Sequence, residues 1–263
     1  MIYLIALLII LFLAYKLIDK HTHDIEINRE EIYNNNIKEE IKILHLSDLH
    51  FNFDQEYQEK LLEMINNLEY DLLLFTGDYI NDKDYYINLK EFLAGIHNSN
   101  KSFAVFGNHD HEYNINKIKE IFEDNNIEVL DNKGKNLIIK EQEINLLGVD
   151  TPDLDKDNYN QAVLEVELKT GVNILLSHTY HIIEKESLQE IDLVLVGDTH
   201  GGQINLPFIN NILKNNFALK YVSGKYILNH LILLVNRGIG YSILPLRINC
   251  KPEIKLISLN NHH

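Results

Sequence analysis

The strongest constraint on the fold is a regular alternation of short apolar runs with helix-like segments. Residues 41–47 (IKILHLS) form a β-rich run, and the apolar residues of segment 57–68 then recur at spacings of three and four, as on one helix face. Buried-strand runs return at residues 71–76 and 102–106, each followed by a helical pattern. Strands that alternate with helices predict βαβ units and hence an α/β fold.

The second half of the chain continues as strands without a visible domain boundary. Segment 127–149 contains closely spaced short strands, and later strands are expected at residues 172–177, 191–196, 231–236 and 253–259. No internal repeat and no glycine or proline cluster divides the chain, and its 263 residues suit one large α/β domain. We therefore expect a single domain over residues 41–263.

The N-terminus is a continuous apolar run. Residues 1–15 (MIYLIALLIILFLAY) contain no charged side chain, and residues 17 and 18 extend the run past Lys16. A cleaved signal peptide is the rival interpretation, but neither a basic leading region nor a small-x-small cleavage site is present. A buried core helix is less favoured because the run is not amphipathic. We expect an uncleaved single-pass membrane anchor over residues 1–20, in contact with lipid through residues 1–18.

The residues after the anchor suggest an orientation and a tether. Lys16 and Lys20 follow the span, which favours a domain on the cytoplasmic side of the cell membrane. Residues 21–40 are polar, rich in Asn, Asp and Glu, and are expected to form a tether, with a first strand near residues 24–27.

Charge and cysteine content exclude several functions. A net charge of −15 with only three arginines argues against nucleic-acid binding through a basic face. The single cysteine, Cys250, excludes an intramolecular disulfide framework and a cysteine-based zinc site. Metal ligands would therefore be His, Asp, Asn or Glu, and thirteen histidines are available.

Five of the expected strands run into loops that hold possible metal ligands. The carboxyl ends of parallel strands converge on one crevice, and residues i and i+2 of an extended segment point to the same side. Each motif alone is weak evidence, because an Asp-x-His triplet or a Gly-Asp pair is a common accident. The five loops are Asp48-Leu49-His50, Gly77-Asp78, Gly107-Asn108-His109-Asp110, Ser177-His178 and Gly197-Asp198-Thr199-His200.

The order of these motifs resembles the calcineurin-like metallophosphoesterase superfamily, whose loops read D-x-H, G-D, G-N-H-D/E, H and G-H-x-H. The match extends over residues 41–259. Within the superfamily the chain looks most like a membrane-associated branch with G-H-T-H-G-G-Q, because residues 201–203, 236–240 and 244–247 also fit. The resemblance implies the superfamily's sandwich of two β-sheets flanked by helices (α/β/β/α).

The resemblance also implies a ligand set for two divalent ions. Oxygen and imidazole ligands without thiolate suit manganese above all, with zinc or iron as alternatives. Two such ions about 3.5–4 Å apart activate a shared water for in-line displacement, so metal-bound hydroxide is the expected nucleophile. The implied ligands are Asp48, His50 and His200 for the first metal, Asn108 and His178 for the second, and Asp78 as the bridge.

His109 is expected to act on the substrate rather than on a metal. Adjacent residues in an extended loop point apart, so His109 is not a ligand if Asn108 is one. We expect His109 to stabilise the transition state or to protonate the leaving oxygen, with Asp110 orienting its imidazole.

One position departs from the family pattern. Asp198 stands where G-H-x-H has its first histidine. As a ligand, Asp198 would give the site three carboxylates instead of two, which makes the metals less electrophilic and shifts preference from zinc toward manganese. We hypothesise that the second metal binds more weakly or less selectively as a result.

The expected activity is hydrolysis of a phosphodiester or pyrophosphate, on a lipid-linked substrate such as UDP-2,3-diacylglucosamine, which a relative of this branch cleaves. Arg237 is a candidate substrate contact, or pairs with an acidic neighbour. The alternative is a non-catalytic scaffold with an impaired second metal site, which Asp198 alone favours. Segment 204–226 either caps an acyl chain or packs on the sheet, through Leu206, Phe208, Ile209, Leu213, Phe217 and Leu219.

Overall fold

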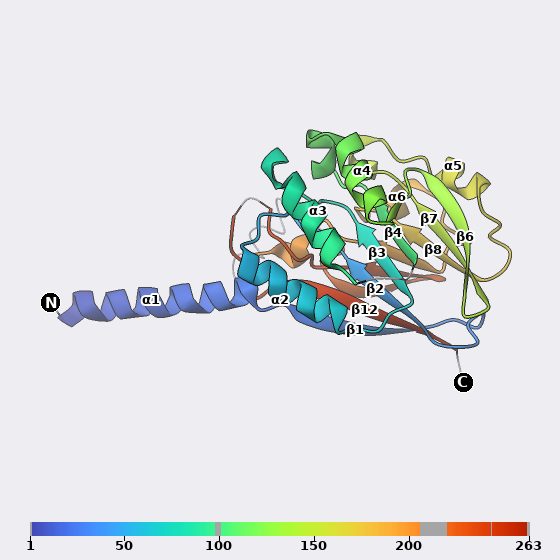
Figure 1. Ribbon diagram of the computed structural model, residues 1–263. Coiled ribbons are helices and arrows are strands. Elements are labelled where there is room, and N and C mark those ends of the chain that lie inside the picture. Colours follow the sequence, from blue (N-terminus) through green and yellow to red (C-terminus); the bar gives the residue numbers. More distant parts are fainter. Residues whose placement is uncertain (1, 98–100, 206–219, 243, 262–263) are drawn as a thin grey trace.

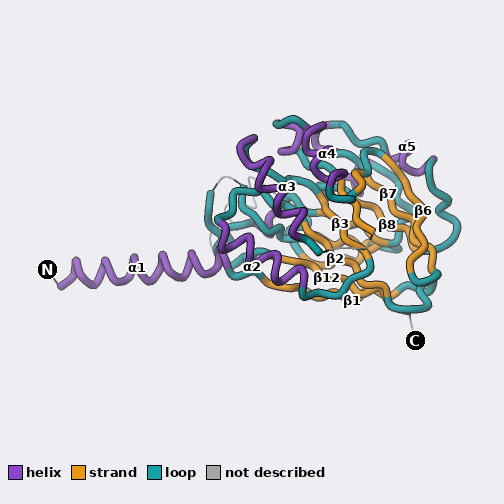
Figure 2. Tube along the Cα trace, viewed as in Figure 1, coloured by secondary structure: helices purple, strands orange, loops and turns teal. Residues whose placement is uncertain are grey.

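Two mixed β-sheets pack face to face between helices in the computed structural model (Figures 1 and 2), which describes residues 2–97, 101–205, 220–242 and 244–261. The expected α/β/β/α sandwich is thus confirmed for this part of the chain. The first sheet has the order β1 (Glu26–Tyr33), β12 (Glu253–Asn260), β2 (Ile41–Leu46), β3 (Leu72–Thr76), β4 (Lys101–Val105), β5 (Glu128–Val129). The second has the order β10 (Gly224–Leu228), β11 (Leu231–Val235), β9 (Leu193–Val196), β8 (Val172–Leu176), β7 (Gln142–Gly148), β6 (Lys133–Ile139).

Side-chain alternation along the strands builds three apolar layers. In β2, Leu44 and Leu46 face the outer helices, whereas Ile41 and Ile43 face the second sheet. The outer helices of the first sheet are α2 (Gln55–Asn66), α3 (Tyr86–Gly95) and α4 (Ile115–Asp124). Those of the second sheet are α5 (Tyr159–Leu164) and α6 (Ile182–Lys185).

The strand directions bring the motif loops to one edge. Strands β2, β3 and β4 are parallel, as are β7, β8, β9 and β11, so their carboxyl ends lie on the same side of each sheet. Strand β12 runs antiparallel to β2, which a simple βαβ expectation does not anticipate. The closely spaced strands expected in segment 127–149 include the antiparallel pair β6 and β7.

The N-terminal run forms helix α1 (Ile2–His23), which projects from the domain (Figure 1). Within the described residues, no helix has the length and apolarity needed to cross a membrane, so the expected spanning anchor is not supported. The last turn of α1 is docked on the domain: Thr22 is buried, and its Oγ1 accepts a hydrogen bond of 2.9 Å from the Arg247 backbone N–H.

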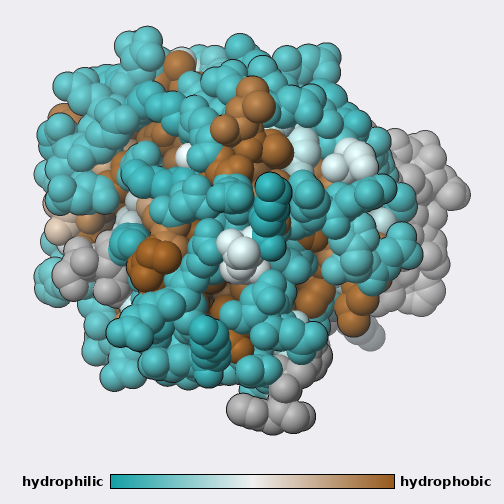
Figure 3. All heavy atoms as spheres, turned by 90° about the vertical axis from the view of Figure 1, so that its right-hand side faces the viewer, coloured by the Kyte–Doolittle hydropathy of each residue, from teal (hydrophilic) through white to brown (hydrophobic). Residues whose placement is uncertain are grey.

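The segment expected to be a tether contributes a strand. Residues 26–33 form β1, which pairs in parallel with β12, so they belong to the first sheet. The expected apolar cap falls largely on residues 206–219, which lie outside the described residues. Figure 3 views the end of the domain opposite α1, where the surface is mostly hydrophilic with scattered apolar patches.

Candidate metal centre

The strand-end loops bring the expected ligands into two buried groups. Asp48, His50 and His200 form one group, and Asp48, Asp78 and His178 form the other, with the ligand atoms of each group within 4.8 Å of one another. These residues follow β2, β3, β8 and β9, so both sheets supply the site. The structure thus unites residues that lie up to 152 positions apart (200 − 48).

The backbone at these loops is held in a strained conformation. Five of the expected ligands have positive φ: Asp48 (49°), His50 (40°), Asp78 (58°), Asp198 (69°) and His200 (51°). Each such residue costs on the order of 1–3 kcal/mol and persists only where the surrounding structure enforces it. This clustering of strain is typical of a functional site.

Two glycines permit the loops to approach one another. A Cβ on Gly107 would lie 2.2 Å from Asp78 Oδ1, and a Cβ on Gly197 would lie 2.2 Å from Asp48 Oδ2. Both contacts are far shorter than real Cβ atoms make, so any other residue here would displace an expected ligand. Steric contact with the expected ligands therefore requires glycine at the first position of the G-N-H motif (Gly107) and of the last G-D motif (Gly197).

Asp78 lies between histidines of the two groups. Its Oδ2 lies 3.4 Å from His50 Nε2 in the first group and 3.2 Å from His178 Nε2 in the second. On the opposite side, His200 Nε2 lies 3.1 Å from His50 Nε2 and 3.4 Å from Asp48 Oδ1. The nitrogen and oxygen donors therefore point at common positions between them.

Hydrogen bonds outside the site aim the imidazoles inward. His50 Nδ1 donates to Asn81 Oδ1 at 2.6 Å, and His178 Nδ1 donates to the Thr76 carbonyl oxygen at 2.7 Å. These bonds fix the tautomers in which Nε2 carries a lone pair, as metal-ligating histidines require. Among the described residues, His178 Nε2 and Asn108 Oδ1 are buried without a hydrogen-bond partner. These two atoms each carry a free lone pair and are therefore suited to bind a divalent cation.

The electrostatics of the site favour added positive charge. Burial raises the pKa of Asp48 to about 7, with neighbouring carboxylates adding to the rise, and burial raises that of Asp198 to about 6. Burial lowers the pKa of His50 to about 4. The pKa of His178 is nevertheless raised, since Asp78, Asp48 and Asp198 outweigh the opposing effect of burial. Close carboxylates in a buried site thus draw in a cation, whether a proton or a metal.

Asp110 has a different role from the one we expected. Its buried carboxylate accepts hydrogen bonds from the backbone N–H groups of Gly107, Asp78 and Tyr79 at 2.8–2.9 Å, which ties two motif loops together. The carboxylate near the half-exposed His109 ring is Glu112, 3.5 Å from Nδ1. The reason is local: residues 109–112 form a 3₁₀ turn, which aligns i with i+3 rather than with i+1.

Asp198 and Arg237 lie at the margins of the centre. Asp198 Oδ1 is 3.8 Å from His178 Nε2, and its backbone N–H donates to Asp48, but it falls outside both buried groups. Arg237 forms ion pairs with Glu253 and with Glu26, the latter at 2.8 Å. The acidic pairing that the sequence left open for Arg237 is therefore present.

The sequence did not indicate the roles of three supporting residues, although Arg247 belongs to the segment 244–247 that fits the family pattern. Asn81 orients His50, Glu112 lies beside His109, and Arg247 is fully buried with its NH2 group 3.4 Å from His200 Nδ1. Arg247 also donates to the Gly240 carbonyl oxygen. The spacing of His109 and Glu112 could have suggested their pairing, whereas Asn81 and Arg247 depend on long-range folding.

Comparisons with known proteins agree with this geometry. The calcineurin-like phosphoesterase family model matches residues 41–202. The metallophosphoesterase YkuE of Bacillus subtilis is 30% identical over 227 residues, which cover 84% of this chain and 79% of the relative. The phosphodiesterase YaeI of Escherichia coli is 29% identical over 227 residues, 83% of this chain and 82% of the relative.

Among solved structures, the 5'-nucleotidase precursor of Thermus thermophilus shares the fold with a TM-score of 0.52 at 13% identity. The similarity covers 84% of this chain and 54% of that one. The family match, the strand-end motifs and the two buried ligand groups lead to one assignment. The chain belongs to the calcineurin-like metallophosphoesterase family.

Proposed function

We propose that the protein is a two-metal phosphodiesterase. The observation that carries this proposal is the pair of buried Asp/His groups that share Asp48, with Asp78 between the histidines of both. Two divalent ions bound there would lower the pKa of a water and neutralise charge on the phosphoryl oxygens. Manganese is our preferred ion, with zinc or iron as alternatives, because the donors are carboxylate, amide and imidazole groups.

The chain's own residues supply positioning and a proton. His109 lies beside the site, its ring 5.1 Å from that of His50 between centroids, and its side chain is partly exposed. The backbone N–H of His109 donates to Asp78 Oδ1 at 3.0 Å, which fixes the loop relative to the bridging carboxylate. We assign His109 the transfer of a proton to the leaving oxygen.

Metal reconstitution tests this function directly. Full-length protein in mild detergent, which shields the exposed side chains of α1, is stripped with a chelator and given manganese, zinc or iron. We expect hydrolysis of bis-p-nitrophenyl phosphate only after metal addition, and a rise in melting temperature of about 5–10 °C at saturating metal. A folded protein that binds metal without any turnover would instead favour the non-catalytic scaffold.

Asp198 is expected to set the metal preference. Its replacement by histidine restores the family motif and removes one negative charge near His178. We expect Asp198→His to raise affinity for zinc relative to manganese by about tenfold, measured by competition between the two ions. Asp198→Asn is the control that removes the charge without adding imidazole. Unchanged metal content and rate in Asp198→His would rule out this role.

We further propose a lipid-linked substrate at the cell membrane, with the domain on the cytoplasmic side. Support comes from the exposed apolar side chains of α1, such as Tyr3 and Phe12, and from the lysines that follow them. The family resemblance suggests one specific reaction of this kind, hydrolysis of the pyrophosphate bond in UDP-2,3-diacylglucosamine. Cell fractionation of the full chain and of a variant lacking residues 1–20 tests the location. Equal recovery of both in the soluble fraction would refute it.

A further inference from the structure

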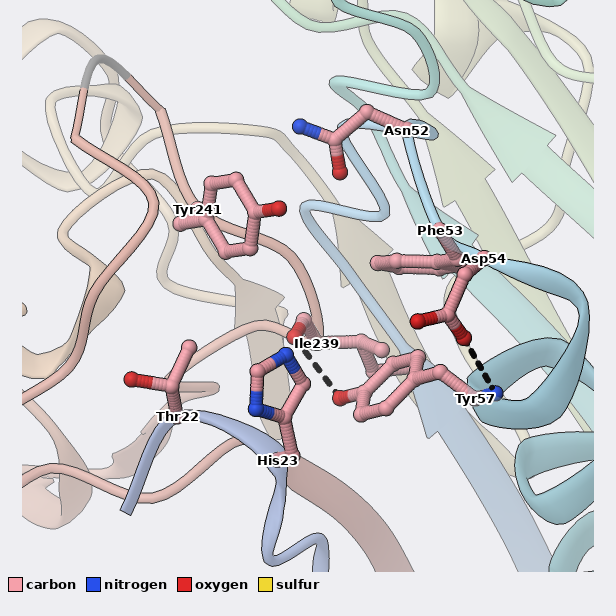
Figure 4. A pocket seen from close by; sticks show the side chains of 8 residues that line it. All are labelled: Thr22, His23, Asn52, Phe53, Asp54, Tyr57, Ile239 and Tyr241. Atoms are coloured by element: carbon pink, nitrogen blue, oxygen red, sulfur yellow. Dashed lines mark hydrogen bonds between the residues drawn. The ribbon is translucent and has the colours of Figure 1, made fainter. Parts of the chain in front are cut away.

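A cavity lies near the metal centre, where α1 meets the domain (Figure 4). It has a volume of about 150 Å³ and shares His23, Asp54 and Tyr57 with a second hollow along α2. The walls come from the end of α1, the loop between β2 and α2, and the loop after β11. The lining residues are Thr22, His23, Asn52, Phe53, Asp54, Tyr57, Ile239 and Tyr241.

The cavity combines aromatic faces with hydrogen-bond acceptors. The ring of Tyr57 lies 4.8 Å from that of Phe53 and 5.6 Å from that of His23 between centroids, and Tyr241 lies on another side (Figure 4). Asn52 Oδ1 is buried without a hydrogen-bond partner among the described residues. Asp54 uses Oδ1 to cap α2 through the Tyr57 backbone N–H, so its second oxygen and its charge stay available.

These features select a cationic ligand group. Aromatic faces attract ammonium groups, most strongly where water is partly excluded. A carboxylate and an orphaned amide oxygen accept the protons that a primary ammonium donates. The described residues that line the cavity include no lysine or arginine. Lys60 lines the adjoining hollow, where its ammonium group donates to the His23 carbonyl oxygen at 3.0 Å. A phosphate or carboxylate would instead meet the negative charge of Asp54.

The cavity wall is continuous with the metal centre. Asn52 follows the expected ligand His50 by two residues, and Asn81 joins the two sites: it accepts from His50 Nδ1 and donates to the Tyr241 carbonyl oxygen at 3.1 Å. The cavity adjoins the loop after β2, whereas His109 follows β4, with β3 between them in the sheet. For an ammonium group to enter the cavity, a diester at the metals must place its retained ester group along the Asn52 wall and its leaving group toward His109.

We propose that this cavity binds a primary ammonium group on the retained alcohol of the substrate, making the preferred substrate an aminoalkyl phosphodiester in place of UDP-2,3-diacylglucosamine, whose amine is acylated. The inference rests on the proposed phosphodiesterase function and names its substrate class. Hydrolysis breaks the P–O bond on the His109 side; water adds hydroxyl to phosphorus, and the leaving alcohol takes the proton. The retained product is an aminoalkyl phosphate.

Two matched substrates test the proposal on the full-length chain. The first is p-nitrophenyl 2-aminoethyl phosphate and the second is its 2-hydroxyethyl counterpart, which differ in the charged group. We expect kcat/KM to favour the amine by about tenfold or more. Asp54→Asn should reduce this ratio to near one. Asparagine keeps the helix cap, as Asn114 does for α4 in this chain.

A binding measurement tests the ammonium site separately from the proposed phosphodiesterase function. Calorimetric titration with ethanolamine, and with ethylene glycol as the neutral control, reports on the cavity whether or not the protein turns over. Amine binding that Asp54→Asn and Asn52→Leu weaken supports the cavity assignment, even if bis-p-nitrophenyl phosphate is not hydrolysed and the proposed function fails. Turnover of that ester with equal rates on the matched substrates, or a preference that survives in Asp54→Asn, would overturn the ammonium site alone.

Discussion

Replacement of Asp78 by asparagine is expected to lower turnover by at least about 10³-fold and to reduce the bound metal. The substitution keeps the size of the side chain but removes the charge of the oxygen that lies between His50 and His178. Loss of an outer-shell partner alone typically costs 10–100-fold in metal affinity or activity, so loss of a bridging ligand should cost more. Metal content by elemental analysis and kcat/KM at saturating manganese give the two readouts.

The control for Asp78→Asn lies at the opposite end of β3. Asp71 precedes β3 at its other end, where it accepts from the Lys42 backbone N–H and pairs with Lys140. Asp71→Asn should leave metal content and turnover close to those of the parent protein, since it removes a carboxylate far from the centre. If Asp78→Asn kept both ions and full activity, the bridging role would be wrong.

The local pattern of the sequence was sufficient to predict the strands that carry the site. The runs that became β2, β3 and β4 are apolar and end at polar motifs, so their burial and their direction could be inferred from short stretches. Strand β1 was harder to predict, because its sequence EINREEIY reads as a polar segment. It is an edge strand whose pairing with β12, more than 200 residues later, supplies the ordering.

The residues of the two buried groups were predictable for the same reason, but their surroundings were not. Asp48, His50 and Asp78 sit at strand ends in recognisable motifs, and the structure places them together. The partner that orients His50 is Asn81, and Arg247 reaches His200 from 47 residues away. No local motif marks Asn81, and the segment 244–247 that contains Arg247 does not by itself show its contact with His200, which only the packing of both sheets creates.

His109→Ala is expected to slow hydrolysis by about 10²–10⁴-fold while leaving the metal content unchanged, which is the range for loss of a positioned general acid. The ring of His109 stands outside both buried ligand groups, so its removal should not release an ion. The loss should be large for a diester with an alkyl leaving group and smaller for p-nitrophenyl esters, because p-nitrophenolate leaves without a proton.

A neighbouring histidine provides the matched control for this role. His111 belongs to the same 3₁₀ turn but pairs with Asp150 at 2.7 Å, away from the ligand groups. The effect of His111→Gln on the hydrolysis rate, relative to the parent protein, should therefore be the same for alkyl and p-nitrophenyl esters. Glu112→Gln should slow alkyl esters more than p-nitrophenyl esters, but less strongly than His109→Ala does, since Glu112 lies beside the His109 ring. An equal loss for alkyl and p-nitrophenyl esters in His109→Ala would mean that His109 binds the phosphoryl group and does not protonate the leaving oxygen, because only proton donation depends on the basicity of that oxygen.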